Sequence, residues 1–134
     1  MNPNLVLDTN ILISGYLWTG RPQQAIRIVK SKAFTPLYCR ESIDELIRVL
    51  SIKFRLDSEE IFRIVFDLQT MGKNIRIISK EQPITDDITD NLFINLAIDG
   101  NAKIIVSGDS HLLRLKEYKQ IEIMNVYEFL RRHL

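Results

Sequence analysis

The chain has little of what cross-links small secreted or metal-stabilised domains. Its 134 residues include one cysteine, Cys39, and two histidines. An internal disulfide is therefore impossible, which fits a reducing compartment, and no Cys/His cluster suggests zinc. We interpret Cys39, at the end of a predicted strand, as an inert buried thiol. With 46% hydrophobic residues, the chain is long enough to bury a core without cross-links, and we expect one domain over residues 1–134.

Long apolar runs and an excess of one charge are also missing. No segment reaches about 18 apolar residues, and the N-terminus lacks a basic stretch before a long apolar one. Membrane insertion and export are therefore not expected, and the predicted location is cytoplasmic. The 18 Lys and Arg residues nearly balance 17 Asp and Glu residues, for a formal net charge of +1. A nucleic-acid ligand would need local contacts or bound cations, because no strong overall field attracts it.

Short apolar runs alternate with amphipathic segments along the chain. Strands rich in branched residues, of the kind that a sheet buries on both faces, are expected at 4–7, 34–39, 75–78, 103–106 and 121–124. Helical spacing of apolar residues, with Pro22 in one first turn and glycines at two helix ends, predicts the segments between them. Such alternation favours parallel pairing through right-handed crossovers and hence an α/β fold. Helices are expected at 11–17, 22–29, 43–50, 58–72, 91–100, 112–115 and 126–130.

Four acids fall where these elements change. Asp8 follows the first strand, Asp109 follows a late strand, Asp90 begins a helix and Glu45 lies within one. The carboxyl ends of parallel strands share one edge of a sheet, so Asp8 and Asp109 can converge there, and the crossovers can bring the other two alongside. Converging carboxylates raise one another's pKa unless a cation neutralises them. Mg²⁺ and Mn²⁺ are the natural choices because both prefer oxygen ligands.

Each of these residues also has a purely structural interpretation. Asp8 and Asp90 are favoured helix N-caps, and Asp109 can simply make a turn. Glu45 on a helix edge is by default a solvated charge. His111 is either a contact to a phosphate or leaving group, or incidental. The remaining loop acids are interpreted as surface charges: Asp44, Asp86, Asp87 and Asp99.

Four stretches together carry a resemblance to a known family. They are Leu7-Asp8-Thr9-Asn10-Ile11-Leu12-Ile13-Ser14, Glu45-Leu46 with Val49-Leu50 after it, Asp90-Asn91-Leu92-Phe93 followed by Leu96-Ala97, and Val106-Ser107-Gly108-Asp109 followed by Leu112-Leu113. Their order and spacing, over nearly the whole chain, resemble a PIN domain, in particular the stand-alone bacterial PIN proteins of toxin–antitoxin pairs. The resemblance implies a three-layer α/β/α fold with a central, mostly parallel sheet of four or five strands.

The resemblance also implies a Mg²⁺- or Mn²⁺-dependent endoribonuclease. Asn10 and Ser107 match polar residues that orient the metal ligands. In such an enzyme a metal-bound hydroxide attacks phosphorus in line, and no nucleophilic side chain is needed. His111 stands where relatives often carry a further Asp, so we expect one firmly held ion and a second that arrives with substrate, which His111 would ligate as Mn²⁺. The matches to the acidic metal ligands are Asp8, Glu45, Asp90 and Asp109.

Partners and alternatives follow from the same resemblance. RNA is the implied substrate, an antitoxin the implied inhibitor, and a homodimer the implied assembly. The segment 16–18, Tyr-Leu-Trp, is either an exposed apolar patch for self-association or part of the core. Arg40 and Lys116 either hold phosphates or are solvated. The alternative function is a catalytically silent PIN-like module that binds RNA or protein; a dehalogenase-like phosphatase is disfavoured because Asn10 stands where it needs an Asp.

Overall fold

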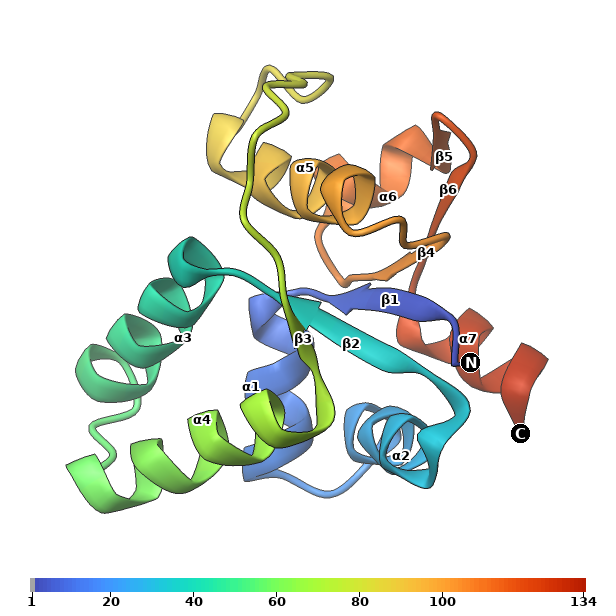
Figure 1. Cartoon of the computed structure of the whole chain (residues 1–134). Helices are drawn as coiled ribbons and strands as arrows, with labels where there is room; N and C mark the ends of the chain where they lie inside the picture. Colours follow the sequence, from blue (N-terminus) through green and yellow to red (C-terminus); the bar gives the residue numbers. More distant parts are fainter. Residues whose placement is uncertain (1) are drawn as a thin grey trace.

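Six strands form one sheet at the centre of the molecule (Figure 1). The computed structural model describes residues 2–134, apart from the side chain of Lys32. The strand order is β3-β2-β1-β4-β6-β5, and all neighbours are parallel except the antiparallel pair β5 and β6. The strands are β1 (Asn4–Leu7), β2 (Thr35–Tyr38), β3 (Lys73–Asn74), β4 (Ile104–Val106), β5 (Glu117–Tyr118) and β6 (Ile121–Met124).

Helices cover both faces of this sheet, which confirms the three-layer α/β/α fold. Alternation along β1 sorts the two cores: Leu5 and Leu7 pack into one cluster and Val6 into the other. The first cluster is covered by α1 (Thr9–Leu17), α2 (Arg21–Ile28) with its π-helical continuation (Val29–Ala33), α3 (Arg40–Ile52), α4 (Ser58–Met71) and α7 (Val126–His133). The second is covered by α5 (Asn91–Asp99), preceded by a 3-10 turn (Ile88–Asp90), and α6 (Ser110–Leu115).

The strand order reverses between β1 and β4. The chain builds β2 and β3 outward on one side of β1 and then returns to form β4 on the other side. The two strands are locked in register, since Leu5, Val6 and Leu7 lie opposite residues 104–106. In parallel α/β sheets such a switch point leaves a crevice at the carboxyl ends of the strands, where ligands bind. Asp8 and Ser107 are the first residues beyond those ends.

Two strand predictions were wrong. The expected strand at 75–78 is instead the two-residue β3, which pairs with β2 through residues 73–74. Beyond it the backbone N–H groups of Ile78 and Ser79 donate to the Asp99 carboxylate, at 2.8 and 3.0 Å, and leave the sheet edge. The predicted four or five strands are six because β5 was missed. Its hairpin turns at Lys119 and Gln120, both at positive φ, without the Gly or Asn that usually announces such a turn.

Several smaller predictions are resolved by burial. Tyr16 and Leu17 pack against the first core cluster, whereas Trp18 is 52% exposed. The core interpretation is therefore confirmed for Tyr16 and Leu17, Trp18 alone is exposed, and a role in self-association stays a prediction. Cys39 is buried, and burial raises the pKa of its thiol. Within the described part of the chain, none of the helices combines the length and apolar character that a bilayer crossing requires.

Gly15 tests how tightly α1, the helix that follows Asp8, packs on α2. A Cβ at this position would clash with the Ile26 side chain and lie 2.9 Å from the carbonyl oxygen of Pro22. We expect Gly15→Ala to lower the free energy of unfolding by about 1–3 kcal/mol, because the backbone of α2 must shift. The matched control is Gly108→Ala, whose Cβ would meet nothing within 4 Å. Equal urea-unfolding midpoints for the two variants would contradict this packing argument.

Candidate metal centre

A single hydroxyl connects the residues that follow β1 and β4. Ser107, fully buried, donates its hydroxyl hydrogen to Oδ2 of Asp8 and accepts the backbone N–H of Asp109 at 2.9 Å. Asp8, 3% exposed, also accepts the N–H of Ile11 at 2.9 Å through Oδ1 and so caps α1. The capping interpretation of Asp8 is therefore correct. It does not remove the residue from the rim of the sheet, because the cap and the Ser107 contact both lie there.

Asp109 is likewise a helix cap. One of its oxygens, Oδ1, accepts the N–H groups of His111 and Leu112 at 2.7 and 3.3 Å, at the start of α6. Its Oδ2 accepts no hydrogen bond from the described residues. The carboxylate is thus oriented by one oxygen and keeps the other for a ligand.

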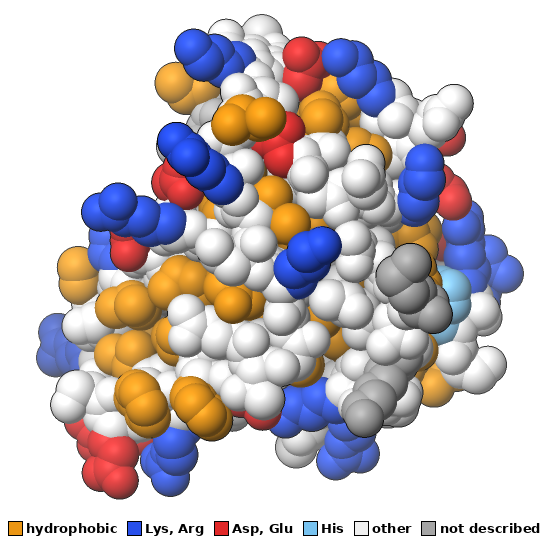
Figure 2. Space-filling model, in the orientation of Figure 1, with side chains coloured by type: hydrophobic (Ala, Val, Ile, Leu, Met, Phe, Trp, Pro, Cys, Tyr) orange, Lys and Arg blue, Asp and Glu red, His pale blue; other side chains and the backbone are white. Residues whose placement is uncertain are grey.

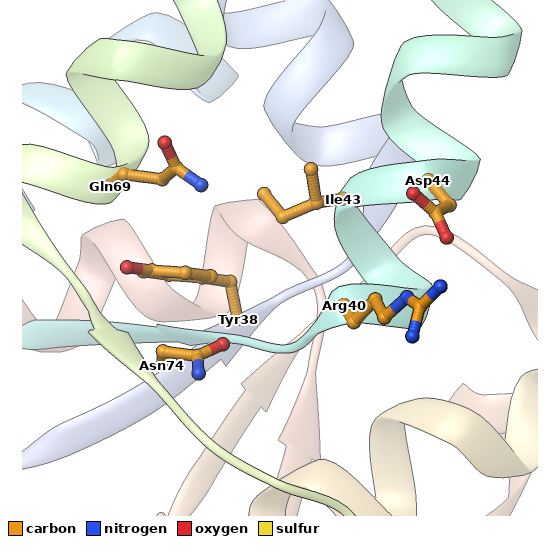
Figure 3. A pocket seen from close by; sticks show the side chains of 6 residues that line it. All are labelled: Tyr38, Arg40, Ile43, Asp44, Gln69 and Asn74. Carbon is orange, nitrogen blue, oxygen red and sulfur yellow. The ribbon is translucent and has the colours of Figure 1, made fainter.

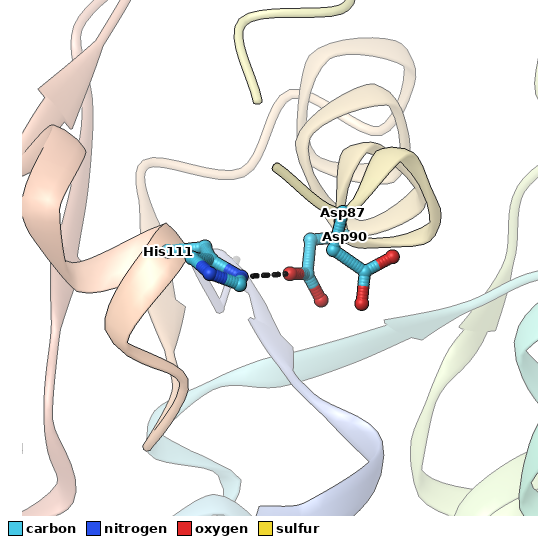
Figure 4. A group of neighbouring side chains, drawn as sticks. All are labelled: Asp87, Asp90 and His111. Atoms are coloured by element: carbon cyan, nitrogen blue, oxygen red, sulfur yellow. Dashed lines mark hydrogen bonds and ion pairs between the residues drawn. The ribbon is translucent and has the colours of Figure 1, made fainter. Parts of the chain in front are cut away.

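Asp90 faces across the switch point toward α6. It makes no side-chain cap for α5, so the capping interpretation of Asp90 is wrong. Its Oδ2 instead lies 3.3 Å from Nδ1 of His111, which is also 3.6 Å from Oδ1 of Asp109 (Figure 4). His111 therefore sits between two of the four predicted acids and is not incidental to their arrangement.

Asp87 also belongs to this group, although the sequence favours a surface charge at this position. Asp87, Asp90 and His111 each offer one ligand atom, and these three atoms lie within 4.8 Å of one another. The signal in the sequence is the spacing of two acids three residues apart, which a 3-10 turn over 88–90 brings to one side. Among the described residues this is the one trio of His, Cys, Asp and Glu that meets so tightly.

Glu45 approaches from α3, half-buried. Beside it lies a hollow of about 440 Å³ lined by Asp44, Glu45, Arg48, Thr89 and Leu92. Burial raises the pKa of Glu45; the Thr9 side chain and Arg48 oppose this, whereas the charges of Asp90 and Asp87 add to it. Glu45 is therefore within electrostatic reach of Asp90 and Asp87, and it borders the hollow.

Mutual repulsion and burial act on three of the acids. Burial is the main cause that raises the pKa of Asp8 and of Asp90, and the Asp109 carboxylate raises both further. Among the side chains that the structure describes, no Lys or Arg forms an ion pair with Asp8, Glu45, Asp90 or Asp109, whereas His111 lies close to Asp90 and Asp109. The Lys and Arg ion pairs of the described residues go elsewhere, to Asp67, Glu81, Asp86, Glu122 and Glu128.

This donor set fits a hard divalent cation. The acids come from four chain segments, and Arg48, the one guanidinium that lowers the pKa of Glu45, forms no ion pair with it among the described residues. Mg²⁺ or Mn²⁺ would supply the balancing charge. Asn10 takes no visible part: it is exposed at the start of α1, and its side chain makes no hydrogen bond with the described residues. Its predicted orienting role stays a prediction.

Comparison with known proteins decides the family. The PIN domain profile matches residues 4–111 of this chain. The chain belongs to the PIN domain family. VapBC2 from Rickettsia felis, solved bound to a DNA fragment from its promoter, is similar at a TM-score of 0.65 and 15% identity, over 91% of this chain and 98% of the matched chain. PAE2754 from Pyrobaculum aerophilum is similar at a TM-score of 0.62 and 15% identity, over 97% of this chain and 88% of the matched chain. No protein with a curated description matches.

Two buried asparagines of this PIN domain hold the loop that carries Asp87. The Asn91 amide accepts the N–H of Ile84 at 3.0 Å and donates to its carbonyl at 2.9 Å. Asn95 does the same with the backbone of Glu81, at 2.8 and 3.0 Å. Sequence reasoning missed both roles. The available signal was two amides four residues apart on an otherwise apolar helix.

The raised pKa values predict that metal affinity depends on pH. Asp8, Glu45 and Asp90 hold protons more tightly in the fold than in the free side chains, and these protons must leave before an ion binds. We expect the Mn²⁺ dissociation constant to rise at least about tenfold from pH 7.5 to pH 5.0, measured by calorimetry. An affinity that is constant over this range would contradict it.

Proposed function

We propose that this PIN domain is a divalent-metal-dependent nuclease that hydrolyses RNA phosphodiester bonds. One observation carries the proposal: at the β1/β4 switch point the buried Asp8 and the partly buried Asp90 and Asp109 repel one another, and none of them forms an ion pair with a Lys or Arg among the described side chains. The family supports a nuclease. In this proposal Asp8, Glu45, Asp90 and Asp109 hold the cation, and a bound Mg²⁺ or Mn²⁺ supplies a hydroxide nucleophile and neutralises charge on the phosphate.

The residues around the cation have separate tasks in this proposal. Ser107 keeps the Asp8 carboxylate fixed, so that its remaining lone pairs point to the crevice. The hollow beside Glu45 admits the RNA backbone, and Arg48 at its wall offsets phosphate charge. Asp87, Asp90 and His111 are the candidate ligands of a second ion that arrives with substrate. An imidazole ligand favours Mn²⁺ over Mg²⁺ at that position.

The alternative is a catalytically silent module that binds RNA or protein with the same fold. Metal uptake separates the two functions. Absence of Mn²⁺ binding at millimolar concentration would favour the silent module, since the converging acids would then serve no cation. The cytoplasmic location and one domain over residues 1–134 belong to the proposal as well.

We further propose an antitoxin as the inhibitory partner and self-association of the chain. The likeness to VapBC2, of the toxin–antitoxin class, supports such a partner. Apolar surface is available on α3 and α4 (Figure 2), where Phe62 and Phe66 are stacked and exposed. Trp18, edge-on to Phe54, extends it from the end of α1. Exposed aromatic side chains that lie together are typical of protein interfaces.

Cleavage of RNA tests the nuclease. Wild-type protein with Mn²⁺ should cut a mixed pool of single-stranded RNA, and Glu45→Gln should reduce the rate about 100-fold because it removes a charged ligand. The matched control is Glu59→Gln, an exposed acid of α4 without an ion pair among the described residues. Equal rates for wild type and Glu45→Gln would refute the assignment; a slow Glu59→Gln would point to a general charge effect.

Co-expression tests the partner. The protein encoded next to this chain should form a stable complex with it and relieve the growth arrest that the chain causes alone. Phe62→Ser, at an exposed position, should weaken that complex or the homodimer about tenfold in a sedimentation experiment, without loss of thermal stability. A monomer that ignores the neighbouring protein would count against both parts of the partner proposal.

A further inference from the structure

A second cavity opens at the same edge of the sheet, outside the candidate metal centre. It has a volume of about 430 Å³ and is lined by Tyr38, Arg40, Ile43, Asp44, Gln69 and Asn74. Tyr38 ends β2, as the residue before Asp8 ends β1, so both hollows lie beyond the carboxyl ends of neighbouring strands. This volume lies within the range of small-ligand sites.

The polar side chains of this cavity are unpaired within the described part of the chain. The Tyr38 hydroxyl, the Arg40 guanidinium, the Asp44 carboxylate and the two amides make no hydrogen bond or ion pair with any other described side chain or backbone group. Their convergence in one hollow is therefore unused by the fold. Side-chain groups of this kind, gathered around a cavity, are what a polar ligand requires.

Another hollow of similar size shows the contrast. Beside β6 and α7, Arg132 pairs with Glu122 at 2.9 Å and with Glu128 at 3.1 Å. Asn125 there accepts the N–H of Glu128 and caps α7. Apart from Lys116, the polar side chains of that hollow are thus paired with other described residues. The Tyr38 cavity differs from it in chemistry, not in size.

The arrangement around Tyr38 matches a nucleotide. Its ring lies between Gln69 of α4 and Asn74 of β3, with Arg40 and Asp44 of α3 toward the other end (Figure 3). An aromatic ring stacks on any nucleobase, and amide side chains both donate to and accept from base edges. A guanidinium is the preferred partner of a phosphate.

The cavity and the hollow of the candidate metal centre share one lining residue. Asp44 lines both, and it is the chain neighbour of Glu45. Arg40 and Arg48 lie one helical turn before and after Asp44, so each hollow has one guanidinium. An RNA strand with its phosphate at the acids would pass along this side of α3. A repeating phosphate backbone accounts for one guanidinium in each hollow, whereas a protein ligand does not require this spacing.

We propose that this cavity binds a nucleotide of single-stranded RNA next to the cleavage point, its base on Tyr38 between Gln69 and Asn74 and its phosphate on Arg40. The proposal rests on the proposed nuclease function and deepens it, because it names where the substrate is held and where base preference arises. Tyr38 and Arg40 are binding residues in it, separate from the acids that hold the cation.

Binding measured without cleavage tests the proposal. In an Asp90→Asn background, a fluorescent 12-nucleotide single-stranded RNA of mixed sequence is titrated at several salt concentrations. Tyr38→Leu should weaken binding about tenfold with an unchanged salt slope, whereas Tyr38→Phe, which keeps the ring, should bind like its parent. Arg40→Ala should weaken binding and reduce the slope of log K against log salt by about 0.7.

Two control variants and a further variant within the cavity complete the experiment. Gln24→Ala and Arg27→Ala, both exposed on α2, should bind like the parent. Asn74→Ala, at an exposed position, should change the relative affinities for poly(A), poly(C) and poly(U) even if Tyr38→Leu fails to fold. Parental RNA affinity in the Tyr38, Arg40 and Asn74 variants, with RNA cleavage unchanged when the same substitutions are made in the otherwise wild-type chain, would overturn the nucleotide site and leave the nuclease intact.

The remaining outcomes distinguish failure of the proposed nuclease function from failure of the nucleotide site alone. A wild-type chain that neither binds nor cuts RNA would refute the proposed function, and the nucleotide site with it. Variants that lose a protein partner but keep RNA affinity would also overturn the site and assign the cavity to that partner.

Discussion

The Ser107 hydroxyl joins the ends of β1 and β4, and the candidate site depends on this contact. It donates to Asp8 and accepts from the backbone of Asp109, so one buried group sets the positions of two acids that lie far apart in the chain. The contact exists because β1 and β4 are neighbours in register, with Leu7 opposite Val106. A shift of one residue would turn Asp8 away from the rim and Leu7 out of the core.

Helix capping and ligand chemistry are combined in the same side chains. Asp8 caps α1 and Asp109 caps α6, and in Asp109 both backbone donors meet a single oxygen. A cap orients a carboxylate without a flexible side-chain partner, and leaves lone pairs for an ion. The acids are therefore positioned before any cation binds, at the cost of burial and mutual repulsion that raise the pKa of Asp8 and Asp90. This cost is largest in the metal-free protein.

The surroundings of the acids differ in character from one side to the other. Toward α5, the amides of Asn91 and Asn95 fasten the loop to the helix, so Asp87 is brought to His111 by a rigid framework. Toward α3 lie two hollows that share Asp44, and the polar side chains of the one at Tyr38 have no hydrogen-bond or ion-pair partner among the described residues. The closed side holds ligands in place, whereas the open side is accessible to a substrate. In the proposed function these are the metal-binding and the RNA-binding sides.

The sequence by itself determined the α/β alternation and the acids at the element ends, because hydrophobic periodicity and strand ends are local properties. Asp8 and Asp109 could be predicted for the same reason, since each follows a buried strand, whereas the three layers and the orienting role of Ser107 were expected from the resemblance to the PIN family. It did not determine that Asp87 meets His111, that Asn91 and Asn95 clamp a loop, or that residues 75–78 leave the sheet. Those depend on which segments the crossovers bring together. The hairpin at Lys119 was missed because its turn lacks the usual residues, and it is stabilised by pairing with β6 and by contacts of Tyr118 and Lys119 with the distant Glu81. Tertiary structure decided these points because contacts between distant segments are set by packing, to which local patterns contribute only one side.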